Sequence, residues 1–170
     1  MQTQVKKFCL SAMLLCCALI ISYIESVLPF SLLIPVPGIK PGFANIAIMV
    51  CFFSLGRLSA LAVSFCRVFF SALIFGSITS FWFSLCGAAC AYLGLLFCDT
   101  VLKNRVSIIG VSVLCAALHC VGQTVAVCLV LGTASVIAYL ALMLLCSLAT
   151  GTICGIAADL VLSHTAVKKQ

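Results

Sequence analysis

Charged side chains are scarce in this sequence, and their scarcity excludes a soluble fold. Nine Lys or Arg and three Asp or Glu make up 7% of the 170 residues, and 65% are hydrophobic. A soluble domain carries about 25% charged and about 45–50% apolar residues. At about 20 residues per crossing, the chain has room for five or six helices. We therefore expect an all-α integral membrane bundle of six transmembrane helices, forming one membrane domain over residues 1–170.

Acidic residues are the rarest charged type, and this limits the chemistry that the chain can perform. Glu25, Asp99 and Asp159 are the three carboxylates, and they lie far apart in the sequence. Prenyl transfer through Mg²⁺ needs clustered carboxylates, and the chain has no D-D-x-x-D run, no H-E-x-x-H motif and no Walker A loop. We predict no catalytic residue, no metal site and no cofactor, and we do not expect an enzyme that acts alone.

The basic residues do not form a patch, which argues against a nucleic-acid partner. They lie at the ends of apolar runs, as the positive-inside rule requires. With six crossings and both termini in the cytoplasm, Lys40 falls outside, Arg67 falls within the membrane, and the cytoplasmic side receives the other seven: Lys6, Lys7, Arg57, Lys103, Arg105, Lys168 and Lys169. The apolar run from Phe8 to Leu28 lacks an A-x-A-like cleavage site, so we interpret it as a retained first span.

Cysteine is abundant, but its spacing does not indicate a disulfide framework or a metal site. The 13 cysteines are scattered through apolar runs, and no C-x-x-C occurs. Cys86 and Cys90 share a helix face, but two thiols do not form a cluster. A buried free cysteine behaves as a small hydrophobic residue, and we favour that interpretation.

Proline is confined to one stretch. All four prolines lie between Pro29 and Asn45, together with two glycines and Lys40. Proline fixes φ and removes a backbone donor, so this stretch cannot be a continuous helix. We predict an extracytoplasmic Pro/Gly-rich loop over residues 29–42. A plain connection and a functional loop are both compatible with the pattern, and the lysine set among prolines and glycines favours the second.

The apolar runs predict six helices. The second is short for a full crossing and could be a thin span or one arm of a re-entrant hairpin. In the last helix, Gly151 and Gly155 form a GxxxG pattern, extended at the same spacing by Ser147 and Asp159. Asp99 and Lys103, four residues apart, predict an ion pair at one helix end. The six predicted ranges are about 8–27, 43–55, 58–75, 81–102, 107–131 and 134–162.

Polar side chains from four of these elements are expected at similar depth. A helix rises 1.5 Å per residue, which places Arg67 about 14 Å and His119 about 18 Å into the membrane. A buried guanidinium must face the bundle or a wet cavity. We predict a ligand-binding pocket in the outer half of the bundle, and its expected residues are Glu25, Lys40, Asn45, Arg67, His119 and Gln123.

Structural roles for the same residues stay open. Arg67 and Glu25 could form an ion pair that locks two helices together. His119 and Gln123 are one turn apart, so they share a helix face. Their side chains could serve only as interhelical hydrogen-bond partners, at about 0.6 kcal/mol each.

Three runs of the sequence resemble a known family. They are PGIKPGFANI (37–46), RVFFSALIFG (67–76) and HCVGQ (119–123). They resemble the Gx transporter family, also described as heptaprenyl diphosphate synthase component I. That family is similar in size and hydropathy to the substrate-binding S components of energy-coupling factor (ECF) transporters. The resemblance covers about residues 8–165 and implies a multi-pass protein of the bacterial inner membrane.

The resemblance implies a function that the residues alone do not give. Our leading hypothesis is an S-component-like, substrate-binding subunit of a transporter for a small vitamin-like or anionic solute. Such a subunit needs an energising partner, such as an ECF-type transmembrane and ATPase module. The alternative is a non-catalytic membrane subunit (component I) of heptaprenyl diphosphate synthase, or of a quinone- or flavin-linked electron-transfer system, with Arg67 and Lys40 holding a diphosphate. Its partner would be a prenyl diphosphate synthase subunit. A third hypothesis is a structural membrane scaffold.

Overall fold

The computed structural model describes residues 2–28 and 40–164, and every regular element in these ranges is helical. Most of the predicted proline loop, residues 29–39, lies outside the described residues. Short helical turns, η2, η3 and η4, follow or precede the longer helices. The elements in order are α1 (Gln2–Val27), α2 (Asn45–Leu55), α3 (Arg57–Phe75), α4 (Ile78–Phe97), η2 (Cys98–Leu102), η3 (Lys103–Arg105), α5 (Ile108–Leu131), η4 (Ser135–Tyr139) and α6 (Leu140–His164).

The helix ends have local causes in the sequence. The Ser77 hydroxyl accepts a hydrogen bond from the Ser80 N–H at 3.2 Å and caps the start of α4. The Ser107 hydroxyl caps α5 in the same way, with a 3.2 Å bond from the Gly110 N–H. Gly56 alone separates α2 from α3, and its φ of +100° is a conformation that favours glycine.

Five of the helices in the described ranges are long and apolar enough to cross a membrane. They are α1, α3, α4 with η2, α5, and α6 with η4. With 11 residues, α2 is about 16 Å long, whereas the hydrocarbon core is about 30 Å thick. The all-α class is thus confirmed for the described residues, with five helices that could span a membrane and α2 as the short element that the sequence indicated. Six crossings and a cytoplasmic side for both termini stay predictions.

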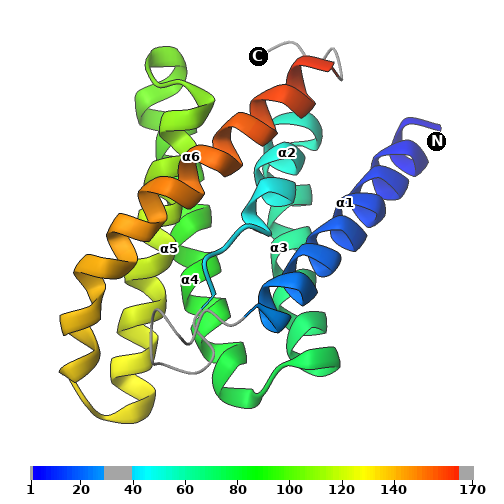
Figure 1. Ribbon diagram of the computed structural model, residues 1–170. Coiled ribbons are helices and arrows are strands. Elements are labelled where there is room, and N and C mark those ends of the chain that lie inside the picture. Colours follow the sequence, from blue (N-terminus) through cyan, green and yellow to red (C-terminus); the bar gives the residue numbers. More distant parts are fainter. Residues whose placement is uncertain (1, 29–39, 165–170) are drawn as a thin grey trace.

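The short helix α2 occupies only part of the depth of the bundle. Figure 1 shows it beginning near mid-height and ending at the level where α1 begins and α6 ends. The non-helical segment 40–44 therefore lies inside the bundle. Non-helical backbone at membrane depth is tolerated only where protein or a wet cavity surrounds it. Its polar groups must find partners among the neighbouring helices.

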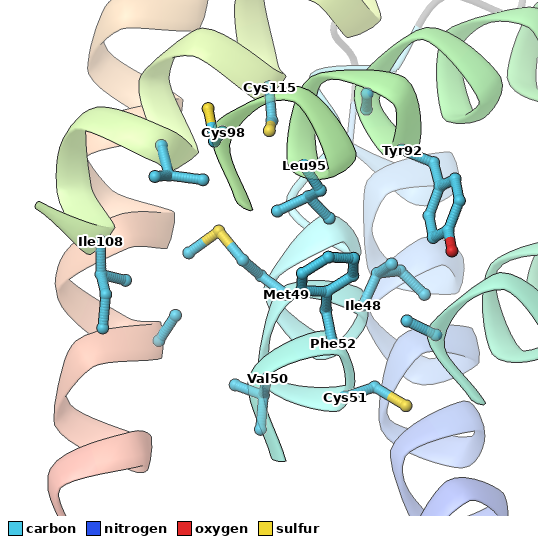
Figure 2. Close-up of a cluster of buried hydrophobic side chains, with 14 of the residues drawn as sticks. Ile48, Met49, Val50, Cys51, Phe52, Tyr92, Leu95, Cys98, Ile108 and Cys115 are labelled. Atoms are coloured by element: carbon cyan, nitrogen blue, oxygen red, sulfur yellow. The ribbon is translucent and has the colours of Figure 1, made fainter. Parts of the chain in front are cut away.

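The main hydrophobic core is built around α2. Six consecutive residues of this helix, 47–52, are buried. Figure 2 shows Met49 and Phe52 among side chains from α4, η2 and α5, including Leu95, Cys98 and Cys115. The Phe52 and Tyr92 rings meet edge to face with centroids 6.2 Å apart. The cysteines of this core are free thiols that pack as small apolar groups.

Glycines of the GxxxG pattern bring α5 and α6 together. A Cβ added at Gly151 would lie 2.8 Å from the Val113 Cα, and one added at Gly155 would lie 2.7 Å from the Ile109 Cα. The pattern therefore serves packing within this chain. Ser147 is buried on the same helix, but Asp159 is exposed, so the close-packed face does not extend to the aspartate.

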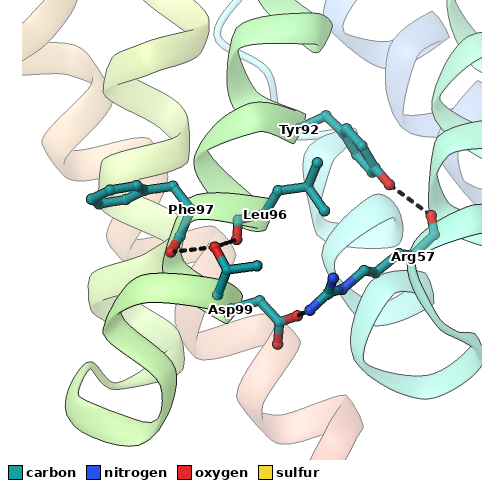
Figure 3. Close-up of polar contacts among 6 residues, drawn as sticks. Arg57, Tyr92, Leu96, Phe97 and Asp99 are labelled. Carbon is teal, nitrogen blue, oxygen red and sulfur yellow. Dashed lines mark hydrogen bonds and ion pairs between the residues drawn. The ribbon is translucent and has the colours of Figure 1, made fainter.

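One predicted ion pair is wrong. Asp99 pairs with Arg57 at the start of α3, with 2.9 Å between the Arg57 Nε and the carboxylate, and this is the ion pair found within the described ranges (Figure 3). The predicted partner, Lys103, has a φ of +45° after the π-helical turn η2. This change of helix geometry moves Lys103 off the face that an i, i+4 pair requires. The Tyr92 hydroxyl also donates to the Arg57 carbonyl oxygen at 2.9 Å.

Candidate functional site

Glu25 of α1 fixes the segment that leads into α2. Its side chain is 3% exposed, and its Oε1 accepts a hydrogen bond from the backbone N–H of Phe43. The chain turns there through Gly42, whose φ is +86°, and the Asn45 N–H bonds to the Gly42 carbonyl at 3.0 Å. A buried carboxylate thus satisfies one of the backbone donors that enter the bundle.

Arg67 lies at the centre of α3 and points into the bundle, as predicted. Its side chain is 4% exposed, and its Nε and Nη2 make no hydrogen bond within residues 2–28 and 40–164. Electrostatic attraction to Glu25 acts on it, but the two groups do not form an ion pair within 4.0 Å in the described part of the chain. Glu25, the predicted partner, therefore attracts Arg67 but does not contact it directly.

His119 and Gln123 of α5 lie against Gly87 of α4. Their side chains are 2% and 0% exposed. A Cβ added at Gly87 would lie 2.9 Å from the His119 Cε1 and 2.8 Å from the Gln123 Cγ. The Nδ1 of His119 and both amide atoms of Gln123 make no hydrogen bond to the described residues. Glycine at position 87 is what allows both polar side chains to lie between two helices.

The segment before α2 brings Asn45 and His119 to the same place. A Cβ added at Gly42 would lie 3.1 Å from the Asn45 Nδ2 and 3.3 Å from the His119 Cδ2. The positive charge of Arg67 also acts on His119. Gly42, Asn45, Arg67 and His119 thus come from three separate stretches of sequence to one region at mid-depth.

Lys40 lies at the edge of this region. Its ammonium group is 5.2 Å from the centroid of the Phe75 ring, a cation–π distance. Burial lowers the pKa of Lys40 below its usual 10.5, the negative charge of Glu25 partly offsets this effect, and the positive charge of Arg67 adds to it. We call Glu25, Lys40, Asn45, Arg67, His119 and Gln123 the polar cluster.

The internal cavity beside the polar cluster is much smaller than the hydrated chamber that a pocket in the outer half suggests. It has a volume of about 20 Å³ and lies between the Pro41–Asn45 turn and the helices. A cavity of about 10–15 Å³ measured in this way holds one water. Among the predicted site residues, Asn45 lines it. Close packing at Gly42 and Gly87 lets the polar side chains fill the space that a larger chamber would need.

Small polar residues of the cavity wall were missed in the sequence. They are Ser64 of α3, Ser112 of α5 and Thr150 of α6. Ser112 is seven residues before His119, which is two helical turns and the same face. That spacing was the available signal for Ser112, whereas Ser64 and Thr150 have no such relation to a charged residue.

A second and larger depression lies between α3 and α4. It is a half-open groove of about 360 Å³ with an apolar lining. Ser64, Ala88 and Tyr92 line both this groove and the small cavity, so these three residues separate the two spaces. The groove contains none of the predicted site residues.

The described part of the chain thus has the features of a helical membrane protein: helices long and apolar enough to span a membrane, a polar centre, and an apolar groove between α3 and α4. The family model for heptaprenyl diphosphate synthase component I matches residues 14–161, and the chain belongs to this family. Searches of curated proteins and of solved structures gave no match.

Proposed function

We propose that this chain is the membrane subunit, component I, of a heptaprenyl diphosphate synthase, and that a partner subunit carries out chain elongation. Family membership over residues 14–161 supports the assignment to such a complex. In this role the chain binds a prenyl diphosphate and keeps its growing apolar chain at the membrane. The chemistry of diphosphate departure belongs to the partner.

The assignment of catalysis to the partner rests on the three carboxylates of this chain, which lie apart from one another. Glu25 accepts a hydrogen bond from Phe43, Asp99 is paired with Arg57, and Asp159 is exposed on α6. Within the described residues, no three His, Cys, Asp or Glu side chains come together. Mg²⁺ bound to a diphosphate is held by carboxylates, so we assign these ligands to the catalytic partner.

Co-purification from the native membrane tests the proposal. The chain carries an affinity tag, is extracted in a mild detergent, and is examined by native mass spectrometry. We expect a prenyl diphosphate synthase to be recovered with it, and we expect the recovered complex to make longer prenyl chains than the separated partner. Recovery of the chain without any synthase would overturn the proposal.

The polar cluster favours a second candidate function, a substrate-binding subunit for uptake of a small anionic or vitamin-like solute. Arg67, His119 and Gln123 are buried with donors that lack hydrogen-bond partners in the described residues. A guanidinium with a free Nε and Nη2 presents the planar fork that binds a carboxylate or phosphate. In this proposal Glu25, Lys40 and Asn45 complete the binding site.

Ligand retention distinguishes the second candidate from the first. Arg67→Ala and Lys40→Ala should abolish retention of a solute that co-purifies with the parent protein. Lys6→Ala is the matched control, because Lys6 is exposed near the start of α1, away from the polar cluster. Equal retention by all three variants would remove this candidate, and failure of the parent to support uptake in cells would favour the synthase subunit.

A further inference from the structure

The groove between α3 and α4 has a defined shape. Its floor is formed by Ser64, Ala88 and Tyr92, which are buried. Its sides are formed by larger side chains, among them Phe65 and Leu93, which are 56% and 62% exposed. Small residues between large ones produce a channel that is open along one side of the bundle, towards the surrounding lipid.

The dimensions of the groove suit a flexible hydrocarbon chain. It extends along α4 from Leu85 to Leu96, which is about 16 Å at 1.5 Å per residue. Its volume of about 360 Å³ lies within the range of about 300–1,000 Å³ that is typical of small-molecule sites. The small cavity of the polar cluster, at about 20 Å³, has no room for such a chain.

One end of the groove is basic. Tyr92 in the groove floor donates to the Arg57 carbonyl, and the Arg57 side chain extends to Asp99 in η2, just beyond α4 (Figure 3). Lys103 and Arg105 are exposed in the turn that follows. Besides the paired Arg57 and Asp99, this end of the groove therefore has two further exposed cations, Lys103 and Arg105, in the adjoining turn. The opposite end, near Val68 and Leu85, lies among apolar residues.

We propose that the α3–α4 groove holds the isoprenoid chain of a prenyl diphosphate, with the diphosphate bound at the end formed by Arg57, Lys103 and Arg105. Diphosphate is the anion that this charge arrangement complements, since Arg and Lys form charge-assisted hydrogen bonds to phosphate oxygens. The groove then carries the chain from the membrane surface towards its middle. This inference rests on the proposed synthase function and names where its ligand lies.

Photo-crosslinking tests the inference. The probe is farnesyl diphosphate with a diazirine in its terminal isoprene unit, added to the full-length protein in phospholipid nanodiscs. We expect labelled peptides from α3 and α4, and we expect unmodified farnesyl diphosphate in excess to suppress the labelling. This competition needs no variant, so it does not depend on the folding of an altered chain.

A matched pair of substitutions makes the test specific. Ala89→Phe fills the groove from its exposed edge, and Ala141→Phe makes the same change on an exposed face of α6. We expect labelling to be lost with Ala89→Phe and retained with Ala141→Phe. Neutralising Lys103 and Arg105 together, as Lys103→Gln and Arg105→Gln, should lower the affinity for farnesyl diphosphate at least about tenfold. The affinity for farnesol, which lacks the diphosphate, should be unchanged.

The outcomes separate the groove from the proposed function. Labelling spread over all lipid-facing helices, or labelling that a phospholipid suppresses as well as farnesyl diphosphate does, would overturn the groove inference. If the synthase partner co-purifies and the groove is unlabelled, the groove inference alone fails. If the groove is labelled with the expected selectivity and no synthase is recovered, the groove is supported and the synthase assignment fails.

Discussion

The Glu25 carboxylate accepts a hydrogen bond from the backbone N–H of Phe43, 18 residues further along the chain. This contact joins α1 to the turn that begins α2, across the stretch that contains residues 29–39. The charges of Arg67 and Lys40 both act on this carboxylate, so the residue that anchors the turn also attracts these two cations.

Replacing Glu25 should therefore destabilise the fold. Glu25→Ala leaves the Phe43 N–H without its acceptor, and hydrogen bonds to charged groups contribute about 1.5–3 kcal/mol. We expect the free energy of unfolding in detergent micelles to fall by about that amount. Glu25→Gln keeps an acceptor and should lose less. Ser26→Ala is the control, because its hydroxyl bonds to the Tyr23 carbonyl on the exposed side of α1. A Glu25→Ala protein as stable as the Ser26→Ala protein would contradict the anchoring role.

Gly87→Ala should disturb the polar cluster without changing its chemistry. The added methyl group would meet Gln123 and His119 at under 3 Å, and overpacking of this kind costs about 1–3 kcal/mol. The measurement is thermal unfolding of the single variants and of the double variant with Gln123→Ala. Because Gln123→Ala removes the nearest atom, we expect Gly87→Ala to cost less in that background, with a coupling of at least about 0.5 kcal/mol. Strict additivity would show that the two positions are independent.

Lys40 should make stability depend on pH in the alkaline range. The pKa of Lys40 is lowered in the folded protein, with burial as the largest cause. Between this lowered value and the usual 10.5, the unfolded chain binds more protons, so the free energy of unfolding rises with pH. Below the folded-state pKa, both states are protonated and the burial cost is constant. We expect the rise to disappear in Lys40→Gln, measured by denaturant unfolding at a series of pH values. An unchanged slope in that variant would assign the rise to another group.

Reporter fusions test the membrane orientation. The positive-inside rule places the turn with Lys103 and Arg105 in the cytoplasm. We expect a reporter that is active only in the cytoplasm to work when fused after Arg105. A reporter that is active only outside should work when fused after Thr133, in the turn between α5 and η4. The reverse pattern would invert the assignment of both termini.

Much of the fold could be predicted from hydropathy and glycine spacing. The five long helices coincide with apolar runs that end before proline, glycine or basic residues, and Gly151 and Gly155 indicated a close-packed face on α6, which the structure places against α5. Arg67 was expected to face inward because lipid exposure of a guanidinium is costly, and its 4% exposure confirms this.

Other features depend on contacts that sequence patterns do not contain. The partner of Asp99 is on another helix, and the π-helical turn that removes Lys103 from its face has no signature in the residues. The tight packing around His119 depends on Gly42 and Gly87, which lie 77 and 32 residues away in the sequence. The predicted ligand-binding role of the polar cluster stays a prediction.

Gly56 is the single residue between α2 and α3, which run in opposite directions (Figure 1). An axial displacement of α2 cannot be absorbed by a loop at this joint, so it must be passed on to the first turn of α3. Movement of segment 40–44, inside the bundle, is therefore transmitted through the eleven residues of α2 to Arg57, at the end of the bundle where α2 stops.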